Sequence, residues 1–118
     1  MFKPLIYAVD DVKTDRELYE CKLSTLYNVR TFANYTDCLH AIKVEKPAVI
    51  LCDLILPMDN GWNGIHAVQE VAPDIALIVA TCVDSPMQHQ TAEIEGLRFW
   101  PKHNFTILEQ LINECLEI

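Results

Sequence analysis

The sequence lacks the features of several large protein classes. No segment approaches the ~20 apolar residues of a membrane-spanning helix, and residues 1–4 lack the apolar stretch of a signal peptide. Basic side chains are scarce: nine Lys and Arg stand against seventeen Asp and Glu, which gives a net charge of −8. Such a balance disfavours direct binding to nucleic acid or to an anionic membrane. Because 51% of the 118 residues are hydrophobic, disorder is excluded as well. We expect one acidic, soluble domain spanning residues 1–118.

Cysteine and histidine are present without the spacings that bind metal or form disulfide frameworks. The five cysteines form no CxxC pair, and their odd number does not suit a set of disulfides. The four histidines show no HxH or HxxxH spacing, so a zinc site is not expected. We interpret the cysteines as reduced, mostly apolar residues of a cytoplasmic protein.

Short apolar runs alternate with helical patterns along the chain. The runs predict buried strands at residues 5–9, 28–32, 48–52, 75–80 and 98–100. Helices are predicted at residues 14–26, after a cap at Asn34, at 64–71, at 85–95 and in the C-terminal segment. Five strand–helix units predict an α/β fold, with an open parallel sheet covered by helices on both faces.

Several local features refine this prediction. Pro101 cannot donate a sheet hydrogen bond, which favours an edge position for the last strand. Pro57 and Gly61 indicate a loop after the third strand. Thr106 and Glu109 have the spacing of a capping box at the start of the last helix. In the first helix, we expect one apolar stripe formed by Leu18, Cys21 and Leu26.

Polar side chains follow four of the predicted strands where each strand ends. Asp10 and Asp11 follow the first strand, Asp53 the third, Thr81 the fourth and Lys102 the fifth. Ligands of such sheets bind beyond the carboxyl ends of the strands. Two carboxylates ~4 Å apart repel by about 4 kcal/mol at an effective dielectric of about 20, so this cluster requires a cation. Oxygen ligands favour Mg²⁺ or Mn²⁺. The set predicts a site that handles phosphoryl groups, with Asp53 as nucleophile.

At these residues the sequence resembles the response-regulator receiver domains of two-component signalling. The acidic pair, Asp53, Thr81 and Lys102 match the family's pattern in order and strand context. So does the loop from Asp53 to Gly61, with proline four and glycine eight residues beyond Asp53. The resemblance covers essentially the whole chain. It implies a flavodoxin-like, three-layer fold with five helices and the strand order 2-1-3-4-5.

The resemblance also implies roles for individual residues. Asp53 would accept a phosphoryl group from the phosphohistidine of a sensor histidine kinase or phosphotransfer protein. Asp11 and Asp53 would bind Mg²⁺ directly, with the backbone carbonyl of Ile55 as third protein ligand, and Asp10 would act through metal-bound water. Lys102 would pair with the Asp53 carboxylate and then with the phosphoryl group.

Further implied roles concern switching and phosphoryl lifetime. Thr81 would move toward the phosphoryl group, and Phe99 would occupy the vacated space, with Trp100 as the other candidate aromatic. His103 stands where the family usually has proline. Cys82 stands where the family prefers a very small residue. Ile55 and Val83 occupy positions that tune phosphoryl lifetime, and because both are apolar we expect slow dephosphorylation.

The resemblance implies that the protein is a switch, which changes its contacts with other proteins through its last two helices and last strand. It would be no enzyme beyond its own phosphorylation and dephosphorylation. Six acids after residue 81 favour a basic or apolar protein as the downstream target or output domain. A phosphorylation-dependent dimer is a further expected state. Two alternatives remain: a receiver-like scaffold that never takes phosphate, and a small Mg²⁺-dependent phosphohydrolase. The phosphohydrolase is disfavoured because Ile55 stands where such enzymes carry a second aspartate.

Overall fold

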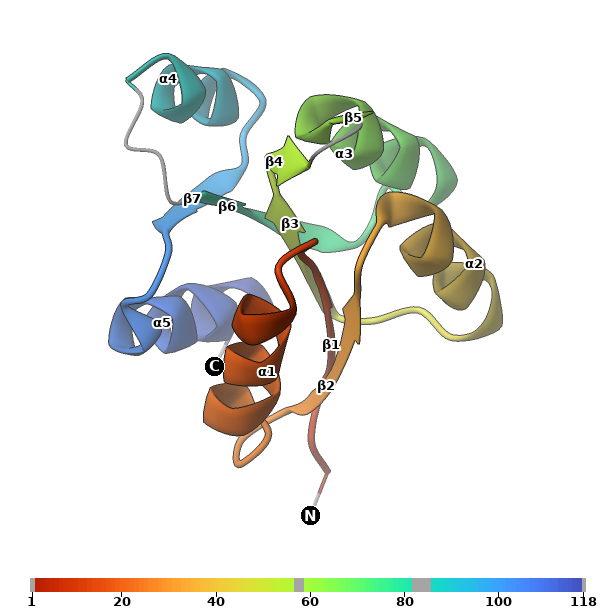
Figure 1. Ribbon diagram of the computed structural model, residues 1–118, viewed down its shortest axis with the longest axis vertical. Coiled ribbons are helices and arrows are strands. Elements are labelled where there is room, and N and C mark those ends of the chain that lie inside the picture. The colour runs from red at the N-terminus through yellow and green to blue at the C-terminus, as the bar shows by residue number, and fades with distance from the viewer. Residues whose placement is uncertain (1, 57–58, 82–85, 118) are drawn as a thin grey trace.

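The computed structural model describes residues 2–56, 59–81 and 86–117 (Figure 1). Within these residues, five parallel strands form one sheet in the order β2-β1-β3-β6-β7. Their bounds are β1 Leu5–Val9, β2 Asn28–Phe32, β3 Val49–Asp53, β6 Ala76–Thr81 and β7 Arg98–Pro101. Numbered as the main strands alone, this is the expected order 2-1-3-4-5. The edge position predicted for the strand with Pro101 is also confirmed.

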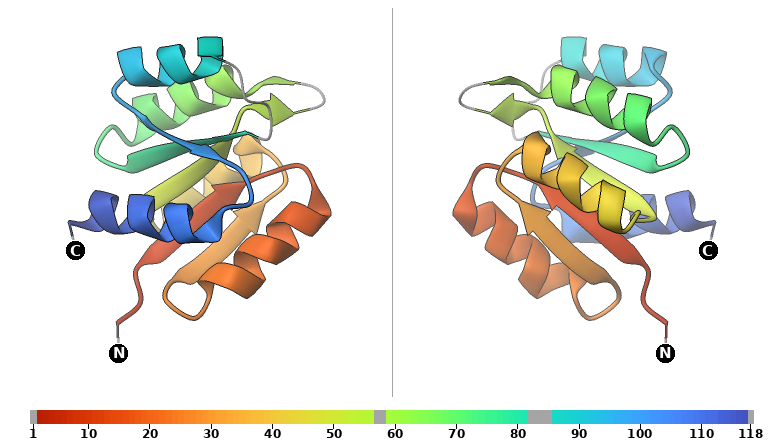
Figure 2. Two further views of the ribbon diagram at one scale, coloured as in Figure 1. Left: turned by 90° about the vertical axis from the view of Figure 1, so that its left-hand side faces the viewer. Right: turned by 90° about the vertical axis from the view of Figure 1, so that its right-hand side faces the viewer.

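Helices cover both faces of the sheet. In the described part of the chain they are α1 Lys13–Leu23, α2 Tyr35–Val44, α3 Gly61–Val71, α4 Pro86–Ile94 and α5 Phe105–Leu116. Figures 1 and 2 show α1 and α5 on one face of the sheet, and α2, α3 and α4 on the other. The predicted three-layer, flavodoxin-like architecture is therefore confirmed.

Alternation along the central strands divides the core in two. In β1, Tyr7 and Val9 pack on the side of α2, α3 and α4, whereas Ile6 and Ala8 pack on the side of α1 and α5. Every residue of β3 is buried, since the strand lies between two other strands and under helices on both faces. The continuous apolar runs of the sequence reflect this two-sided burial.

The helix starts are confirmed in one case and corrected in another. Asn34 caps α2 as expected, its side chain accepting a hydrogen bond from the Asp37 backbone N–H at 2.8 Å. The expected capping box of Thr106 and Glu109 is wrong. Helix α5 begins at Phe105, and the Asn104 side chain caps it by accepting from the backbone N–H of residue 107 at 3.2 Å. Packing explains the earlier start, because the Phe105 ring lies edge-on to a core tryptophan, 5.4 Å between centroids.

The expected apolar stripe of α1 is also wrong. The buried residues of α1 are Tyr19 and Leu23, whereas Leu18 is 37% exposed and Cys21 is exposed. Leu26 lies beyond the helix, which ends at Leu23, and is 48% exposed. The tyrosine ring is large enough to fill the space between α1, α5 and the sheet. Tyr19 therefore points into the core, whereas the smaller side chains of Leu18 and Cys21 face outward.

The segment expected to be a loop after β3 contains a short hairpin, β4 Ile55–Leu56 and β5 Asp59–Asn60. Helix α3 begins directly after it, at Gly61, three residues earlier than predicted. Gly61 closes this segment by donating its backbone N–H to the Leu54 carbonyl at 3.1 Å. A Cβ at Gly61 would lie 2.4 Å from the Leu54 Cα, so only glycine fits this close approach.

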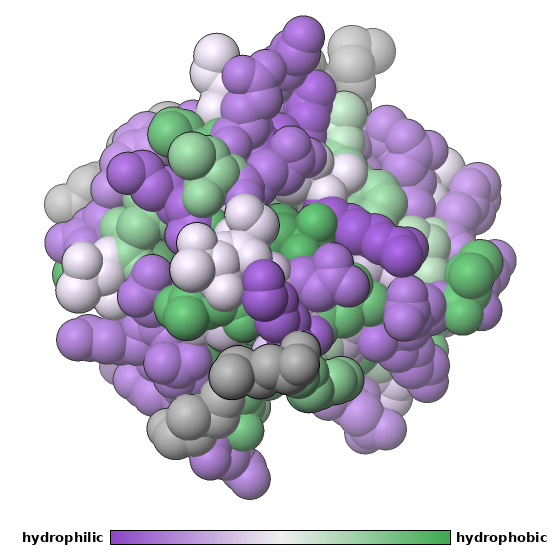
Figure 3. Space-filling view, turned by 90° about the horizontal axis from the view of Figure 1, so that it is seen from below, coloured by the Kyte–Doolittle hydropathy of each residue, from purple (hydrophilic) through white to green (hydrophobic). Residues whose placement is uncertain are grey.

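Most acidic and polar side chains of the described residues lie at the surface, whereas Asp10, Asp53 and Thr81 are buried. The face in Figure 3 is mostly hydrophilic, with apolar side chains scattered among polar ones. None of the described helices has the length and apolar character needed to cross a membrane.

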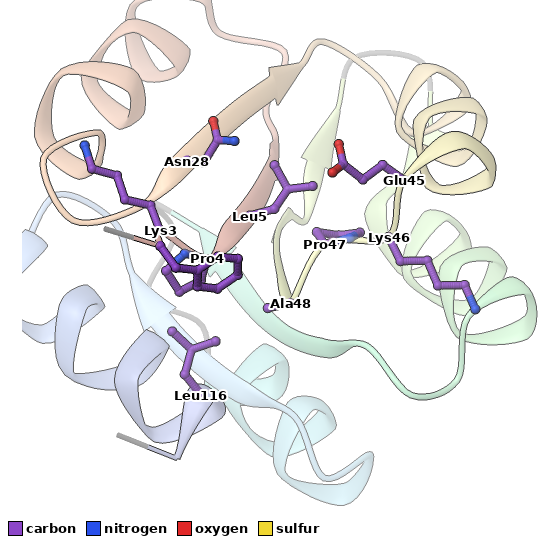
Figure 4. A pocket seen from close by; sticks show the side chains of 10 residues that line it. Lys3, Pro4, Leu5, Asn28, Glu45, Lys46, Pro47, Ala48 and Leu116 are labelled. Atoms are coloured by element: carbon purple, nitrogen blue, oxygen red, sulfur yellow. The ribbon is translucent and has the colours of Figure 1, made fainter.

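A cavity of about 680 Å³ lies at the amino ends of the strands, lined by residues that include Leu5, Asn28 and Ala48 (Figure 4). The amino groups of Lys3 and Lys46 point away from each other there, so these cations do not converge on one ligand. The polar side chains predicted to act together lie at the opposite ends of the strands.

Candidate functional site

Three carboxylates meet at the carboxyl ends of β1 and β3. These strands are adjacent and parallel, with Val9 paired to Cys52, so the residues that follow reach the same edge of the sheet. Asp10, Asp11 and Asp53 each offer an oxygen atom, and the three oxygens lie within 4.8 Å of one another. Asp10 and Asp53 are buried, and Asp11 is partly exposed, which leaves the cluster open on one side. The structure thus brings together the acids predicted from the sequence.

Asp10 is held firmly by protein donors. Its carboxylate accepts hydrogen bonds from the Val12 backbone N–H at 3.0 Å, from the Tyr19 hydroxyl at 3.3 Å and from the Lys102 amino group at 2.6 Å. The Arg16 guanidinium donates to the Asp10 backbone carbonyl at 2.9 Å. These donors stabilise a buried charge that would otherwise be costly.

Lys102 is a cation of the site, and three carboxylates lie within 4 Å of its amino group. Its amino group lies 2.6 Å from Asp10, 3.2 Å from Asp15 and 3.5 Å from Asp53, and its side chain is only 4% exposed. Burial alone would lower the pKa of Lys102, but the hydrogen bond from Lys102 to Asp10 and the charges of Asp53 and Asp10 outweigh it and raise that pKa. Lys102 therefore stays charged at neutral pH.

The end of β7 brings Lys102 to this position. The Lys102 backbone N–H donates to the Thr81 carbonyl at 3.1 Å, so the lysine follows directly on the pairing of β6 with β7. His103, which stands where proline was expected, adopts a positive φ of 84°. Its Nε2 lies 3.3 Å from an Asp15 oxygen. The hydrogen bonds to His103 and Lys102 lower the pKa of Asp15, although burial opposes the shift.

The two candidate switch aromatics lie on opposite faces of the sheet. Phe99 pairs with Val79 and packs on the side of α2, α3 and α4, the face that Thr81 shares with Val79 by strand alternation. Trp100 is fully buried on the side of α1 and α5, where its indole N–H donates to the Asn104 carbonyl at 2.8 Å. Only Phe99 therefore has its side chain on the face that Thr81 occupies.

Four residues of the site were missed in the sequence, and one of them is Arg16, which donates to the Asp10 backbone carbonyl. Asp15 contacts Lys102, the Tyr19 hydroxyl contacts Asp10, and the Tyr35 hydroxyl donates to the Asp53 backbone carbonyl at 2.8 Å. Asp15 lies in the first turn of α1, four residues beyond Asp11, and an acid so close in the sequence to the acidic pair could have indicated it. For the tyrosines the available signal was weaker: a buried tyrosine hydroxyl needs a polar partner, but the sequence does not say which.

The donor set fits a hard divalent cation. All the atoms that converge are carboxylate oxygens, which Mg²⁺ and Mn²⁺ prefer, and the cluster carries an excess of negative charge. Ile55, the expected carbonyl ligand, is the first residue of β4, two residues beyond Asp53. Cys82 and Val83, which were singled out beside Thr81, lie outside the described residues.

Comparison of the sequence with known protein families identifies a match to one family. The family model of the response regulator receiver domain matches residues 6–111. A protein-glutamate methylesterase/protein-glutamine glutaminase of Clostridium acetobutylicum is 32% identical over 96 residues, which are 79% of this chain and 28% of that protein. The chain thus spans less than a third of the length of this curated relative.

Solved structures agree with this assignment. The BeF₃-activated DrrB receiver domain aligns over 99% of this chain and 100% of its own, with 25% identity and a TM-score of 0.86. Response regulator DrrB of Thermotoga maritima aligns over 98% of this chain and 54% of its own, with 25% identity and a TM-score of 0.84. Chemotaxis protein CheY4 of Vibrio cholerae, 24% identical, shares the fold over 95% of this chain and 98% of its own, with a TM-score of 0.82. The chain therefore belongs to the response regulator receiver domain family, a signalling module of two-component systems.

Proposed function

We propose that this receiver domain is a phosphorylation-controlled switch in which Asp53 accepts a phosphoryl group from a phosphohistidine. The donor would be a sensor histidine kinase or a phosphotransfer protein of the cytoplasm. One observation carries the proposal: Asp10, Asp11 and Asp53 converge within 4.8 Å, and the buried Lys102 amino group lies 3.5 Å from Asp53. A buried nucleophilic carboxylate beside a fixed cation suits transfer of an anionic group.

The transfer uses few protein groups. An oxygen of Asp53 forms the new bond to phosphorus while the bond from phosphorus to the histidine nitrogen breaks. The electron pair of the broken bond goes to that nitrogen, which takes up a proton from solvent. Lys102 and the Thr81 hydroxyl would stabilise charge on the phosphoryl oxygens. Mg²⁺ or Mn²⁺, held by Asp11, Asp53 and the Ile55 carbonyl with Asp10 acting through water, would supply further neutralisation of negative charge.

Phosphorylation would be read out on the surface of α4, β7 and α5. Thr81 would approach the phosphoryl group, and Phe99, on the same face of the sheet, would move into the space behind it. The readout partner would be a basic or apolar surface of a downstream protein or output domain, because acidic side chains predominate after residue 81. A phosphorylation-dependent dimer would be a second form of readout. The BeF₃-activated form of the similar DrrB receiver domain supports a switch of this kind.

Incubation with Mg²⁺ and acetyl phosphate, followed by intact mass measurement, tests this function. We expect one added phosphoryl group on the wild type and none on Asp53→Asn. Absence of any addition would contradict the switch and favour a scaffold that never takes phosphate. Continuous release of inorganic phosphate would instead favour a phosphohydrolase.

A further inference from the structure

A buried tyrosine contacts the backbone of Asp53, the proposed phosphoacceptor. Tyr35 is the first residue of α2 and is 5% exposed. Its hydroxyl donates to the backbone carbonyl of Asp53 at 2.8 Å, in a buried hydrogen bond. Asp53 is the last residue of β3, so this bond fixes the backbone at the point where the strand ends and the chain turns.

Two glycines of α3 leave the space in which this contact forms. A Cβ at Gly64 would lie 2.3 Å from the Tyr35 ring, so the ring packs directly on the helix backbone. A Cβ at Gly61 would lie 2.6 Å from the Asp53 carbonyl oxygen. The tyrosine is therefore confined between α2, α3 and the end of β3, and its hydroxyl has little freedom to leave Asp53.

The Tyr35 hydroxyl is also a hydrogen-bond donor at neutral pH. A tyrosine hydroxyl carries its proton at neutral pH, so it can donate to the carbonyl. Loss of the hydroxyl would leave the Asp53 carbonyl without this donor.

We propose that Tyr35 is a positioning residue that fixes the Asp53 backbone and thereby directs the Asp53 carboxylate into the acidic cluster. The inference rests on the proposed function, because it assigns Tyr35 a part in binding the divalent cation and in phosphorylation. Groups that hold metal ligands in place tune affinity strongly, and small misplacements of a nucleophile slow its reaction.

Tyr7 offers a matched control. It is a fully buried tyrosine of the same core cluster, and its hydroxyl donates to the backbone carbonyl of Glu45 at 2.6 Å. Glu45 lines the cavity at the amino ends of the strands, away from the acidic cluster. Tyr7→Phe removes the hydroxyl that donates to the carbonyls of Glu45 at 2.6 Å and Ala41 at 3.4 Å, whereas Tyr35→Phe removes the hydroxyl that donates to the Asp53 carbonyl.

The test compares Mg²⁺ affinity, followed by tryptophan fluorescence without any phosphodonor, in the wild type and both variants. Tyr35→Phe should raise the Mg²⁺ dissociation constant roughly tenfold, the lower end of the effects seen when such supporting groups are lost. Tyr7→Phe should stay within about twofold of the wild type. Phosphorylation by acetyl phosphate should slow only in Tyr35→Phe, and the ¹³C shift of the Asp53 carbonyl should change only there.

The outcomes separate this inference from the proposed function. Wild-type Mg²⁺ affinity in Tyr35→Phe, or an equal loss in Tyr7→Phe, would overturn the positioning role. Weaker Mg²⁺ binding in Tyr35→Phe alone would support it even if the wild type took up no phosphoryl group, a result that would contradict only the proposed function. If Tyr35→Phe does not fold, Gly64→Ala displaces the ring while keeping the hydroxyl, and the same loss of Mg²⁺ affinity is expected.

Discussion

Replacement of Lys102 by methionine should destabilise the protein strongly, and Mg²⁺ should reverse much of the loss. In the wild type the Lys102 amino group, with a side chain 4% exposed, lies 2.6 Å from Asp10, a residue with no exposed surface. Methionine fills a similar volume but removes the charge. Asp10 would then be a buried anion close to Asp11 and Asp53 without its cation.

The magnitude follows from the burial of the pair. Removal of one partner from a buried ion pair typically costs about 3–5 kcal/mol, because the other charge remains in a poorly solvated position. Domains of this size have a free energy of unfolding of about 5–15 kcal/mol, so the variant would keep only part of its stability. A divalent cation held by the same carboxylates supplies the missing positive charge, and binding to the folded state alone raises stability further.

Urea unfolding followed by circular dichroism measures both effects, with EDTA and with millimolar Mg²⁺. We expect Lys102→Met to lose about 3–5 kcal/mol in EDTA and to regain more with Mg²⁺ than the wild type gains. Lys43→Met, at an exposed lysine in the last turn of α2, serves as the control and should change stability by less than about 1 kcal/mol. A loss below 1 kcal/mol in Lys102→Met, or an equal gain with Mg²⁺ in both proteins, would refute the reasoning.

Four further predictions concern the turn, the helix cap, the thiols and the phosphoryl lifetime. Gly61→Ala forces a Cβ against backbone atoms and should lower the free energy of unfolding by about 1–3 kcal/mol in urea titrations; an unchanged midpoint would contradict the close approach. Asn104→Ala removes the α5 cap and should lower it by about 0.5–2 kcal/mol, whereas stability equal to the wild type would argue against the cap. Burial raises the pKa of the Cys38 thiol to about 12 and also raises that of Cys52, while unfolded thiols titrate near pH 8.5. The folded state therefore keeps protons that the unfolded state releases, so stability is full below about pH 8.5 and falls as the pH rises toward 12; a melting temperature that does not fall between pH 8 and pH 10 would contradict this. Because an apolar side chain cannot orient water, acyl phosphate on the wild type should outlast that on Ile55→Asn; decay within seconds, or equal decay in both, would contradict slow dephosphorylation.

Local chemistry explains why much of the fold could be predicted. Strand β1 was predicted with its observed bounds, because a strand buried on both faces needs a continuous apolar run. Strand β2 was also predicted with its observed bounds, and the Asn34 cap was predicted from its residue type alone. The parallel arrangement then required that the residues at the carboxyl ends of β1, β3, β6 and β7 lie at one edge of the sheet.

Other features depended on competition between residues that look equivalent in the sequence. Asn104 and Thr106 are both capable of capping α5, and the packing of Phe105 decided between them. Leu18 and Tyr19 are both suitable for an inward position, and the depth of the space under α1 selected the tyrosine. A pattern of residue types contains no information on such volumes, so these predictions failed.

The sequence by itself determined the layer order, the acidic edge of the sheet and the receiver family, because these follow from strand burial and from the residues at strand ends. The tertiary structure decided which groups hold that edge together. Asp15 reaches Lys102 from 87 positions away in the chain, and Tyr35 reaches the Asp53 carbonyl from 18 positions away. Such partners are set by where packing places whole helices, since a charge or a hydroxyl interacts over only a few ångströms. The fixed geometry of the acidic site is therefore a property of the assembled fold.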